Sequence, residues 1–291
     1  MLKGDKLIKK QFRATTPLLS GAVHPDTILL ETEYSDMRQD ALDWLNEEIG
    51  ELDEDLYEQD AYFGQCPFMN VVHRLQLEHS GADISFAAPL SFDSVIPKGH
   101  VTIRDMFNLY SYENFLYTMW LTGHEIKGVL ELSYDRWTNT MTSPDDHILR
   151  LAYVLRNGTR LGFEHMAFNF LSAAGINYTV DVTKEAGQKI QIASLSNSTS
   201  PFDLDATYSV AVNSYHGSGG GELFTLGTGL SKAELHSRII KETHTDLREI
   251  FIQRIKHAPC INTTLPSHWS FVPSEWTENA LIRDRKTLFI H

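Results

Sequence analysis

The fold of this chain is decided by residues 82–137, which read "ADISFAAPLSFDSVIPKGHVTIRDMFNLYSYENFLYTMWLTGHEIKGVLELSYDRW". The opening segment, "ADISFAAPL", is apolar and short enough to be a buried strand. The segment "NFLYTMWLTG" is rich in the aromatic and β-branched residues that favour strands. The closing segment predicts a helix with an apolar side made of Ile126, Val129, Leu130 and Tyr134.

The rest of the chain mixes strands and helices without the strict βαβ order of a doubly wound sheet. The elements that we expect are an amphipathic helix within 24–52, a hairpin of "INYTVDVT" (176–183) with "QKIQIASL" (188–195), a strand at "YSVAVNSY" (208–215), a helix at 245–257 and an irregular aromatic tail from 265. This pattern predicts an α/β (mixed α+β) fold of layered helices and mixed sheets.

The amino-acid composition and net charge limit the kinds of molecule that this chain can bind. The 291 residues are 42% hydrophobic and carry a net charge of -13. An acidic chain is a poor partner for nucleic acid polymers, because phosphate backbones require clustered Lys and Arg. A small phosphorylated ligand needs only a local positive pocket. We expect no membrane span, because no apolar run is long enough to cross a bilayer, and no signal peptide is visible.

Motifs for catalysis and metal binding are not found in the sequence. The chain has no H-E-x-x-H, C-x-x-C, G-x-S-x-G or Walker motif, and "SPDDHI" is typical of a polar loop. Cys66 and Cys260 are far apart in sequence, and we expect two buried free thiols rather than a disulfide. We therefore expect no catalytic residue and no metal ligand in this chain.

Two tyrosine motifs suggest a binding site. In "LYSYENFLYTM", Tyr112 precedes Asn114 at the start of a predicted strand. Tyrosines at strand ends usually pack in a core or at its rim, but a pair of them could clamp a flat base, and each stack contributes about 1–3 kcal/mol.

The second motif is "VAVNSYHGSGGGELF" at 210–224, where Asn213, Tyr215 and four glycines follow a strand. Such a glycine run fits either a plain surface turn or a backbone that passes close to a ligand. The residues alone leave both interpretations open.

The order of these motifs resembles the C-terminal domain of the 5'-nucleotidase family, which includes the 2',3'-cyclic-nucleotide 2'-phosphodiesterases that also act as 3'-nucleotidases. The resemblance begins near residue 35, and the matching positions are Ala82-Asp83, Gly99, Thr102, Asp105 to Phe107, Tyr112, Asn114, Gly123, Ile126-Lys127 and Leu130-Glu131. It also extends to the predicted hairpin, the glycine motif and the helix at 245–257.

This resemblance implies a domain arrangement. Enzymes of the family have an N-terminal metallophosphoesterase domain with two metal ions and a C-terminal domain that binds the nucleoside. Residues 1–22 then correspond to the trailing segment of a missing metallophosphoesterase domain, and 23–291 to the nucleoside-binding domain. The divalent metal ions would belong to the missing domain, acting in cis, and this chain would hold no cofactor. Family habit also implies a periplasmic or otherwise exported protein.

The resemblance also implies which residues bind substrate. Two aromatic rings sandwich the base in the family, and Asn side chains and glycine backbone would lie beside it. The matching residues are Tyr112, Tyr215, Asn114, Asn213, Gly219, Gly220 and Gly221. One departure is "PLSFDS" at 89–94, where many 5'-nucleotidases have a turn with a substrate-binding Arg. The motif "YSYEN" at 110–114 also looks more like the cyclic-phosphodiesterase branch. Together the two features favour that branch.

The sequence thus predicts a domain that recognises a nucleoside or nucleotide for a nucleotide-hydrolysing phosphoesterase of nucleotide catabolism. Its substrate class would be that of a 2',3'-cyclic-nucleotide 2'-phosphodiesterase/3'-nucleotidase or of a 5'-nucleotidase. By itself the chain would be inactive, since the catalytic groups lie elsewhere. The alternative is a non-catalytic nucleotide-binding or scaffold protein that retains the fold.

Overall fold

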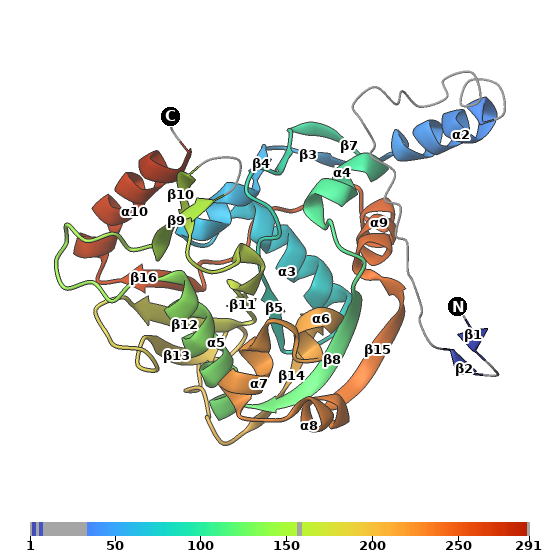
Figure 1. Cartoon of the computed structure of the whole chain (residues 1–291). Helices are drawn as coiled ribbons and strands as arrows, with labels where there is room; N and C mark the ends of the chain where they lie inside the picture. Colours follow the sequence, from blue (N-terminus) through green and yellow to red (C-terminus); the bar gives the residue numbers. More distant parts are fainter. Residues whose placement is uncertain (1, 4–5, 8–33, 156–158, 290–291) are drawn as a thin grey trace. The chain divides into compact units, whose positions relative to one another are not determined.

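A computed structural model of the chain describes residues 2–3, 6–7, 34–155 and 159–289, and divides the chain into two compact units (Figure 1). Unit 1, Met1–Leu45, contains the short strands β1 (Leu2–Lys3) and β2 (Lys6–Leu7) and the helix α2 (Ser35–Leu45). Unit 2, Asn46–His291, contains all the other elements of the described residues. The boundary predicted between residues 22 and 23 lies outside the described residues.

Unit 2 is built on a five-stranded sheet, and this sheet is mixed, as predicted. Its strand order is β11 (Ser172–Ala174), β5 (Ile84–Ala87), β14 (Thr207–Asn213), β8 (Phe115–Thr122) and β15 (Ile239–Asp246). Strand β14 runs parallel to β5 and antiparallel to β8. The two predicted strands of the 82–137 stretch, β5 and β8, are therefore neighbours of the same central strand.

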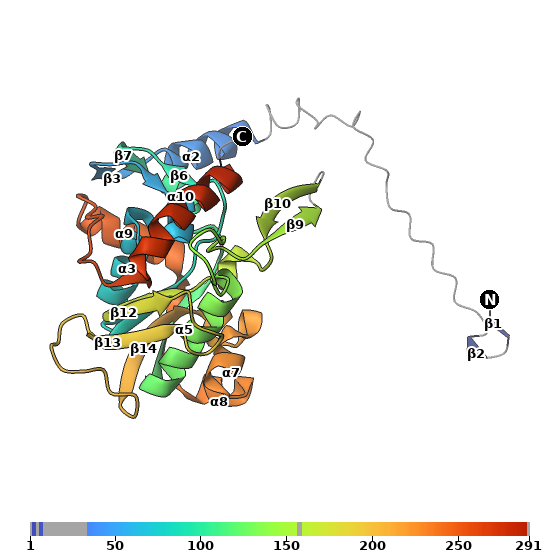
Figure 2. The same cartoon turned by 90° about the vertical axis from the view of Figure 1, so that its left-hand side faces the viewer.

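A second sheet contains the predicted hairpin. Strands β12 (Ile176–Asp181) and β13 (Ile190–Leu195) pair antiparallel, and β16 (Trp269–Val272) pairs parallel to β12. Three two-stranded sheets are formed by β3 (Glu48–Leu52) with β7 (Gly99–Thr102), β4 (Leu56–Tyr57) with β6 (Val95–Ile96), and β9 (Leu151–Leu155) with β10 (Thr159–Phe163). Figure 2 shows the β9–β10 hairpin beyond the layered body of unit 2.

Helices cover both faces of the five-stranded sheet. The α-helices of unit 2 are α3 (Pro67–Ser80), α4 (Ile103–Leu109), α5 (Gly123–Trp137), α6 (Ser214–Gly217), α7 (Leu223–Thr228), α8 (Lys232–Ser237), α9 (Leu247–His257) and α10 (Ser274–Phe289). Neighbouring residues of a strand point to opposite faces. On β5, Ser85 bonds His73 of α3, whereas Phe86 packs on Phe224 of α7, so α3 and α7 lie on opposite faces.

Helix α5 forms the centre of the core. Thr122 and Glu125 form a capping box at its N-terminus, in which the Glu125 carboxylate accepts from the Thr122 N–H at 2.7 Å. Its predicted apolar side is confirmed, because Ile126, Val129 and Tyr134 are fully buried. The helix contacts β8 and β11 of the large sheet and β13 of the second sheet, so it joins the two sheets.

The predicted helix at 24–52 is wrong beyond Leu45, because Glu48–Leu52 is strand β3. Its pairing with β7 shifts register between Glu48 and Gly50, and both Ile49 and Leu52 are buried. A bulge of this kind puts residues three apart on one face. The buried Ile49 and Leu52 therefore have the i, i+3 spacing that is typical of one face of a helix.

The predicted irregular tail is also wrong, because it contains β16 and α10. The buried face of α10 consists of Thr277, Ala280, Asp284 and Leu288. The spacing is helical, but two of these four residues are polar. Asp284 is fully buried and accepts a hydrogen bond from the Leu149 N–H at 2.8 Å. A hydrophobic pattern cannot reveal a helix whose buried face is half polar.

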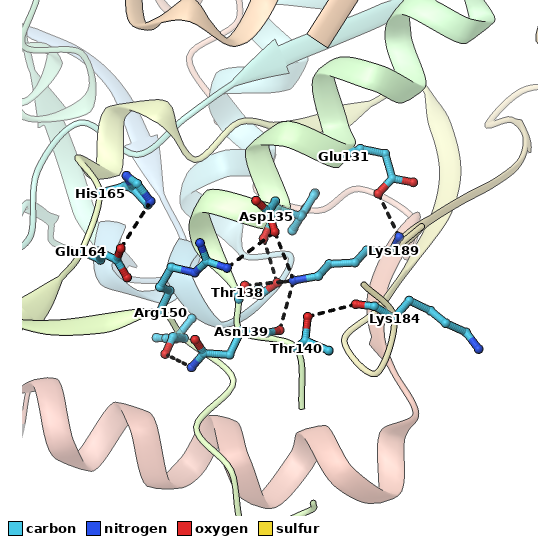
Figure 3. Close-up of polar contacts among 12 residues, drawn as sticks. Glu131, Asp135, Thr138, Asn139, Thr140, Arg150, Glu164, His165, Lys184 and Lys189 are labelled. Atoms are coloured by element: carbon cyan, nitrogen blue, oxygen red, sulfur yellow. Dashed lines mark hydrogen bonds and ion pairs between the residues drawn. The ribbon is translucent and has the colours of Figure 1, made fainter. Parts of the chain in front are cut away.

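A buried lysine ties the second sheet to α5 (Figure 3). The Lys189 ammonium donates to the carbonyl oxygens of Thr138 and Asn139 at 3.0 and 3.1 Å, and it lies 4.0 Å from the Asp135 carboxylate. The Lys189 and Ile190 N–H groups donate to Glu131 at 2.8 and 3.0 Å. Burial lowers the pKa of Lys189 from 10.5 to about 8, although Asp135 opposes that shift.

This arrangement predicts an alkaline gain in stability. Above pH 8 the unfolded chain, with its ordinary lysine pKa, holds more protons than the folded chain, so the free energy of unfolding rises with pH. Between about pH 7 and about pH 9.5 the wild type should gain about 1–2 kcal/mol relative to Lys189→Met in urea titrations. The matched control is Lys184→Met, an exposed lysine of the same hairpin turn. Equal pH dependence in wild type and Lys189→Met would contradict this account.

Candidate functional site

The pairing of β8 with β14 brings the two tyrosine motifs together. Asn213, the last residue of β14, lies opposite Leu116 near the start of β8. The Ser214 hydroxyl accepts a hydrogen bond from the Phe115 N–H at 3.1 Å. Motifs that are about a hundred residues apart in sequence therefore meet at one end of two neighbouring strands.

Tyr110 joins the two asparagines. The Asn114 amide donates to the Tyr110 hydroxyl at 3.2 Å, and a second hydrogen bond links this hydroxyl to the Asn213 side chain. The ring is buried and packs edge-on against Phe251 of α9, with centroids 5.7 Å apart. Burial raises the pKa of Tyr110 to about 12. The hydroxyl therefore keeps its proton at neutral pH and serves as a fixed anchor for both motifs.

Asn213 has a second role, as the cap of α6. Its side-chain oxygen accepts from the His216 N–H at 2.9 Å and lies 3.0 Å from His216 Nδ1. Burial lowers the pKa of His216 to about 4, with a smaller opposing effect from the Phe168 backbone. The neutral imidazole therefore donates from Nδ1 to Asn213, which orients the amide toward Tyr110.

Tyr112 and Tyr215 both expose their rings, with relative accessibilities of 48% and 42%. The Tyr215 ring is held edge-on by Phe168, with centroids 6.0 Å apart, and by His216 at 5.0 Å. Phe168 lies in the short helix η2 (Ala167–Asn169). Sequence reasoning missed Phe168, because one Phe in an aromatic chain carries no motif.

The glycines fit closely around Tyr215 and its neighbours. A Cβ atom at Gly220 would lie 2.6 Å from two carbon atoms of the Tyr215 ring, and one at Gly221 would lie 2.1 Å from the Asn169 side-chain oxygen. Gly219 and Gly221 also have positive φ angles of 84° and 65°, which glycine adopts without strain. The run is therefore more than a plain turn, since the backbone approaches protein side chains closely.

Helix α5 holds the far end of the glycine loop. The Arg136 guanidinium donates to the Gly221 carbonyl at 2.7 Å and lies 3.9 Å from the Glu222 carboxylate. Glu222 has a φ of 63°, and it is the one non-glycine residue with positive φ among the described residues. Such strain costs about 1–3 kcal/mol and persists only where neighbouring contacts enforce it.

The segment 89–94, which contains no Arg, is organised by a buried carboxylate. Glu58, in the short helix η1 (Glu58–Phe63), accepts hydrogen bonds from the Leu90 N–H, from the Ser91 N–H at 3.1 Å and from the Ser91 hydroxyl at 2.5 Å. Burial raises the pKa of Glu58, and the hydrogen bonds offset only part of that effect. The segment therefore has a structural anchor.

The described residues offer no group of three or more His, Cys, Asp or Glu side chains that could hold a metal ion. Within the same residues, no helix has the length and apolar character needed to cross a membrane. Cys66 and Cys260 are free thiols, as predicted, but the prediction that both are buried is wrong for Cys260, which is exposed.

Two grooves lie away from the tyrosines. One, of about 380 Å³, runs along α5 and includes Lys127, Glu131 and Asp135. The other, of about 390 Å³, lies on the polar face of β12, β13 and β16. The charges of the first groove are already paired, because Lys127 contacts Glu131 and Asp135 contacts Arg150. Neither groove is lined by Tyr112 or Tyr215.

The chain resembles known proteins in family, in sequence and in fold. A family model described as the 5'-nucleotidase, C-terminal domain matches residues 48–228. The trifunctional nucleotide phosphoesterase protein YfkN of Bacillus subtilis is 26% identical over 193 residues, which cover 62% of this chain and 12% of that protein. The 2',3'-cyclic-nucleotide 2'-phosphodiesterase/3'-nucleotidase of Salmonella typhimurium is 31% identical over 143 residues, 45% of this chain and 20% of that protein.

Solved structures agree on the fold. The crystal structure of a 5'-nucleotidase precursor from Thermus thermophilus superposes with a TM-score of 0.62 at 20% identity, over 86% of this chain and 44% of that one. The chain therefore spans less than half the length of each of these three relatives. The predicted mixed α/β fold is confirmed.

The glycine packing generates a stability prediction. Gly220→Ala places a methyl group against the Tyr215 ring, and overpacking of this kind lowers the free energy of unfolding by about 1–3 kcal/mol. Ser218→Ala, an exposed residue of the same loop, should change it by less than about 0.5 kcal/mol. Denaturant titration measures both variants. A Gly220→Ala protein as stable as the wild type would show that the loop does not support Tyr215 in solution.

Proposed function

Because this chain belongs to the family of 5'-nucleotidase C-terminal domains, we propose that it recognises the nucleoside part of a nucleotide for a nucleotide-hydrolysing phosphoesterase. The base would stack between the rings of Tyr112 and Tyr215. The backbone of Gly219, Gly220 and Gly221 would form one wall beside it.

One observation carries this proposal: both tyrosine motifs are tied to the same buried hydroxyl. Asn114 and Asn213 each bond Tyr110, and each of them stands two residues from an exposed tyrosine. Rings that sandwich a base must lie about 7 Å apart, twice the usual stacking distance. Common anchoring of the two motifs at Tyr110 supports such a fixed spacing. The asparagine amides would lie at the base of the site, where they mainly hold the loops.

For the substrate we propose a 2',3'-cyclic nucleotide or a 3'-nucleotide. The "YSYEN" motif favours this branch, and one relative at 31% identity is named for both activities. The turn at 89–94 also has no Arg, whereas many 5'-nucleotidases have one there, and it is held by the buried Glu58. A 5'-monophosphate is the second candidate, because the family model and the Thermus structure both bear the name 5'-nucleotidase.

The chemistry would belong to a metallophosphoesterase domain in cis. The described residues of this chain do not fit a metal site, so the divalent metal ions would be held by that other domain. This chain would bind the nucleotide and orient it for the reaction, and such positioning can supply a large share of an enzyme's rate enhancement. We also propose, on family habit, that the protein acts outside the cytoplasm.

The competing function is nucleotide binding without catalysis, in a scaffold protein that retains the fold. The coding sequence upstream of the Met1 codon discriminates between the enzyme and the non-catalytic scaffold. A metallophosphoesterase sequence in frame supports the enzyme. A stop codon followed by a ribosome-binding site, with no such domain nearby, supports the scaffold.

The stacking proposal is tested by titration calorimetry with adenosine. Tyr112→Ala and Tyr215→Ala should each weaken binding by about 1–3 kcal/mol, about 5- to 150-fold in Kd, because each removes one stacking ring. Both rings are partly exposed, so both variants should keep the wild-type melting temperature within a few degrees.

The matched control is Tyr57→Ala, an exposed tyrosine of β4 whose hydroxyl donates to Asp55 at 3.0 Å. Its affinity for adenosine should equal that of the wild type. Unchanged affinity in Tyr112→Ala and Tyr215→Ala would rule out stacking at this site.

A further inference from the structure

The loop that carries Tyr112 is held along its length by the first turns of one helix. This loop, 110–114, connects α4 to β8. At its end, the Asn114 carbonyl accepts a hydrogen bond from the Leu247 N–H of α9 at 2.7 Å. At its start, the Tyr110 ring packs on Phe251, one turn further along α9. Helix α9 itself begins at a fixed point, because Asp246 caps it by accepting from the Glu249 N–H at 3.1 Å.

Arg248 adds a single group that joins the two ends of this loop. Its guanidinium donates to the Tyr110 carbonyl at 3.5 Å and to the Glu113 carboxylate at 3.4 Å. The same guanidinium lies 4.1 Å from the centroid of the Phe107 ring, in cation–π range. Arg248 is 8% exposed, so water competes little with its contacts to the Tyr110 carbonyl and the Phe107 ring. The Glu113 side chain is 82% exposed, so that ion pair is screened and contributes less.

We infer that Arg248 is a positioning residue for Tyr112, which it serves by fixing the loop on both sides of that tyrosine. This inference rests on the proposed function, in which the Tyr112 ring stacks on a base. Tyr112 is nearly half exposed and stands between the two residues that Arg248 contacts, Tyr110 and Glu113. An exposed ring on a free loop loses conformational freedom when it binds, and a loop that is already fixed loses less.

The contacts require an arginine. A planar guanidinium can lie over Phe107 and send separate N–H groups to Tyr110 and Glu113. A lysine ammonium is a compact charge that cannot cover a ring and reach both acceptors in the same way. Arg248→Lys therefore keeps the positive charge but removes the simultaneous contacts with Phe107, Tyr110 and Glu113. For this reason it is the substitution that tests the positioning role most directly.

The experiment is a double-mutant cycle with adenosine as the probe. Arg248→Lys should raise the Kd about fivefold in the wild-type background, because the Tyr112 ring is no longer held in place. In the Tyr112→Ala background the same change should alter the Kd less than about twofold, since no ring remains to position. A merely structural role for Arg248 would give the same factor in both backgrounds and would overturn the inference.

The matched control is Arg254→Lys on the same helix, where the arginine contacts Glu78 at 3.1 Å. This variant should bind adenosine with the wild-type Kd. Circular dichroism and thermal unfolding establish that each variant is folded before its Kd is compared.

A readout without ligand separates this inference from the proposed function. Hydrogen exchange of the amides at 111–114 should be about tenfold faster in Arg248→Lys than in the wild type, because local opening becomes easier. Unchanged exchange there would overturn the inference whatever adenosine does. If the wild type fails to bind adenosine, the proposed function falls, and faster exchange in Arg248→Lys would still support anchoring of the loop.

Discussion

The antiparallel pairing of β8 with β14 is the constraint on which the site depends. It runs without interruption from Thr207 opposite Thr122 to Asn213 opposite Leu116. Both strands lie inside the five-stranded sheet, and the core residues Met119 and Val210 are fully buried. A slip of one residue would turn every side chain of a strand to the other face, so burial fixes the register. That register brings the two tyrosine motifs together where β14 ends and β8 begins.

Around this pairing, the site is supported by groups that do not touch a ligand in the proposed binding mode. Tyr110 joins the two asparagines, Phe168 supports Tyr215, and α9 holds the loop of Tyr112. These supports come from several parts of the chain. Such pre-organisation matters for a domain whose part is binding and orientation, because a ring that is already in place loses little entropy on stacking.

The sequence predicted the central strands correctly from short apolar runs rich in aromatic and β-branched residues, and α5 from apolar residues at helical spacing. It failed where a bulge between Glu48 and Gly50 gave β3 a helical spacing, and where α10 buried polar residues such as Asp284. For the site, the motifs pointed to Tyr112 and Tyr215, but not to their supports. Phe168 and Arg248 act through tertiary contacts. Phe168 belongs to no motif, and the helical pattern around Arg248 does not show what its side chain contacts.

The central claim is that a base binds between Tyr112 and Tyr215. The most direct test is a crystal structure of the chain with adenosine 3'-phosphate. The account predicts a base between the two rings, with ring planes about 7 Å apart, and Gly219–Gly221 beside the nucleoside. A nucleotide bound instead in the groove along α5, or rings that stay apart at saturating ligand, would contradict it.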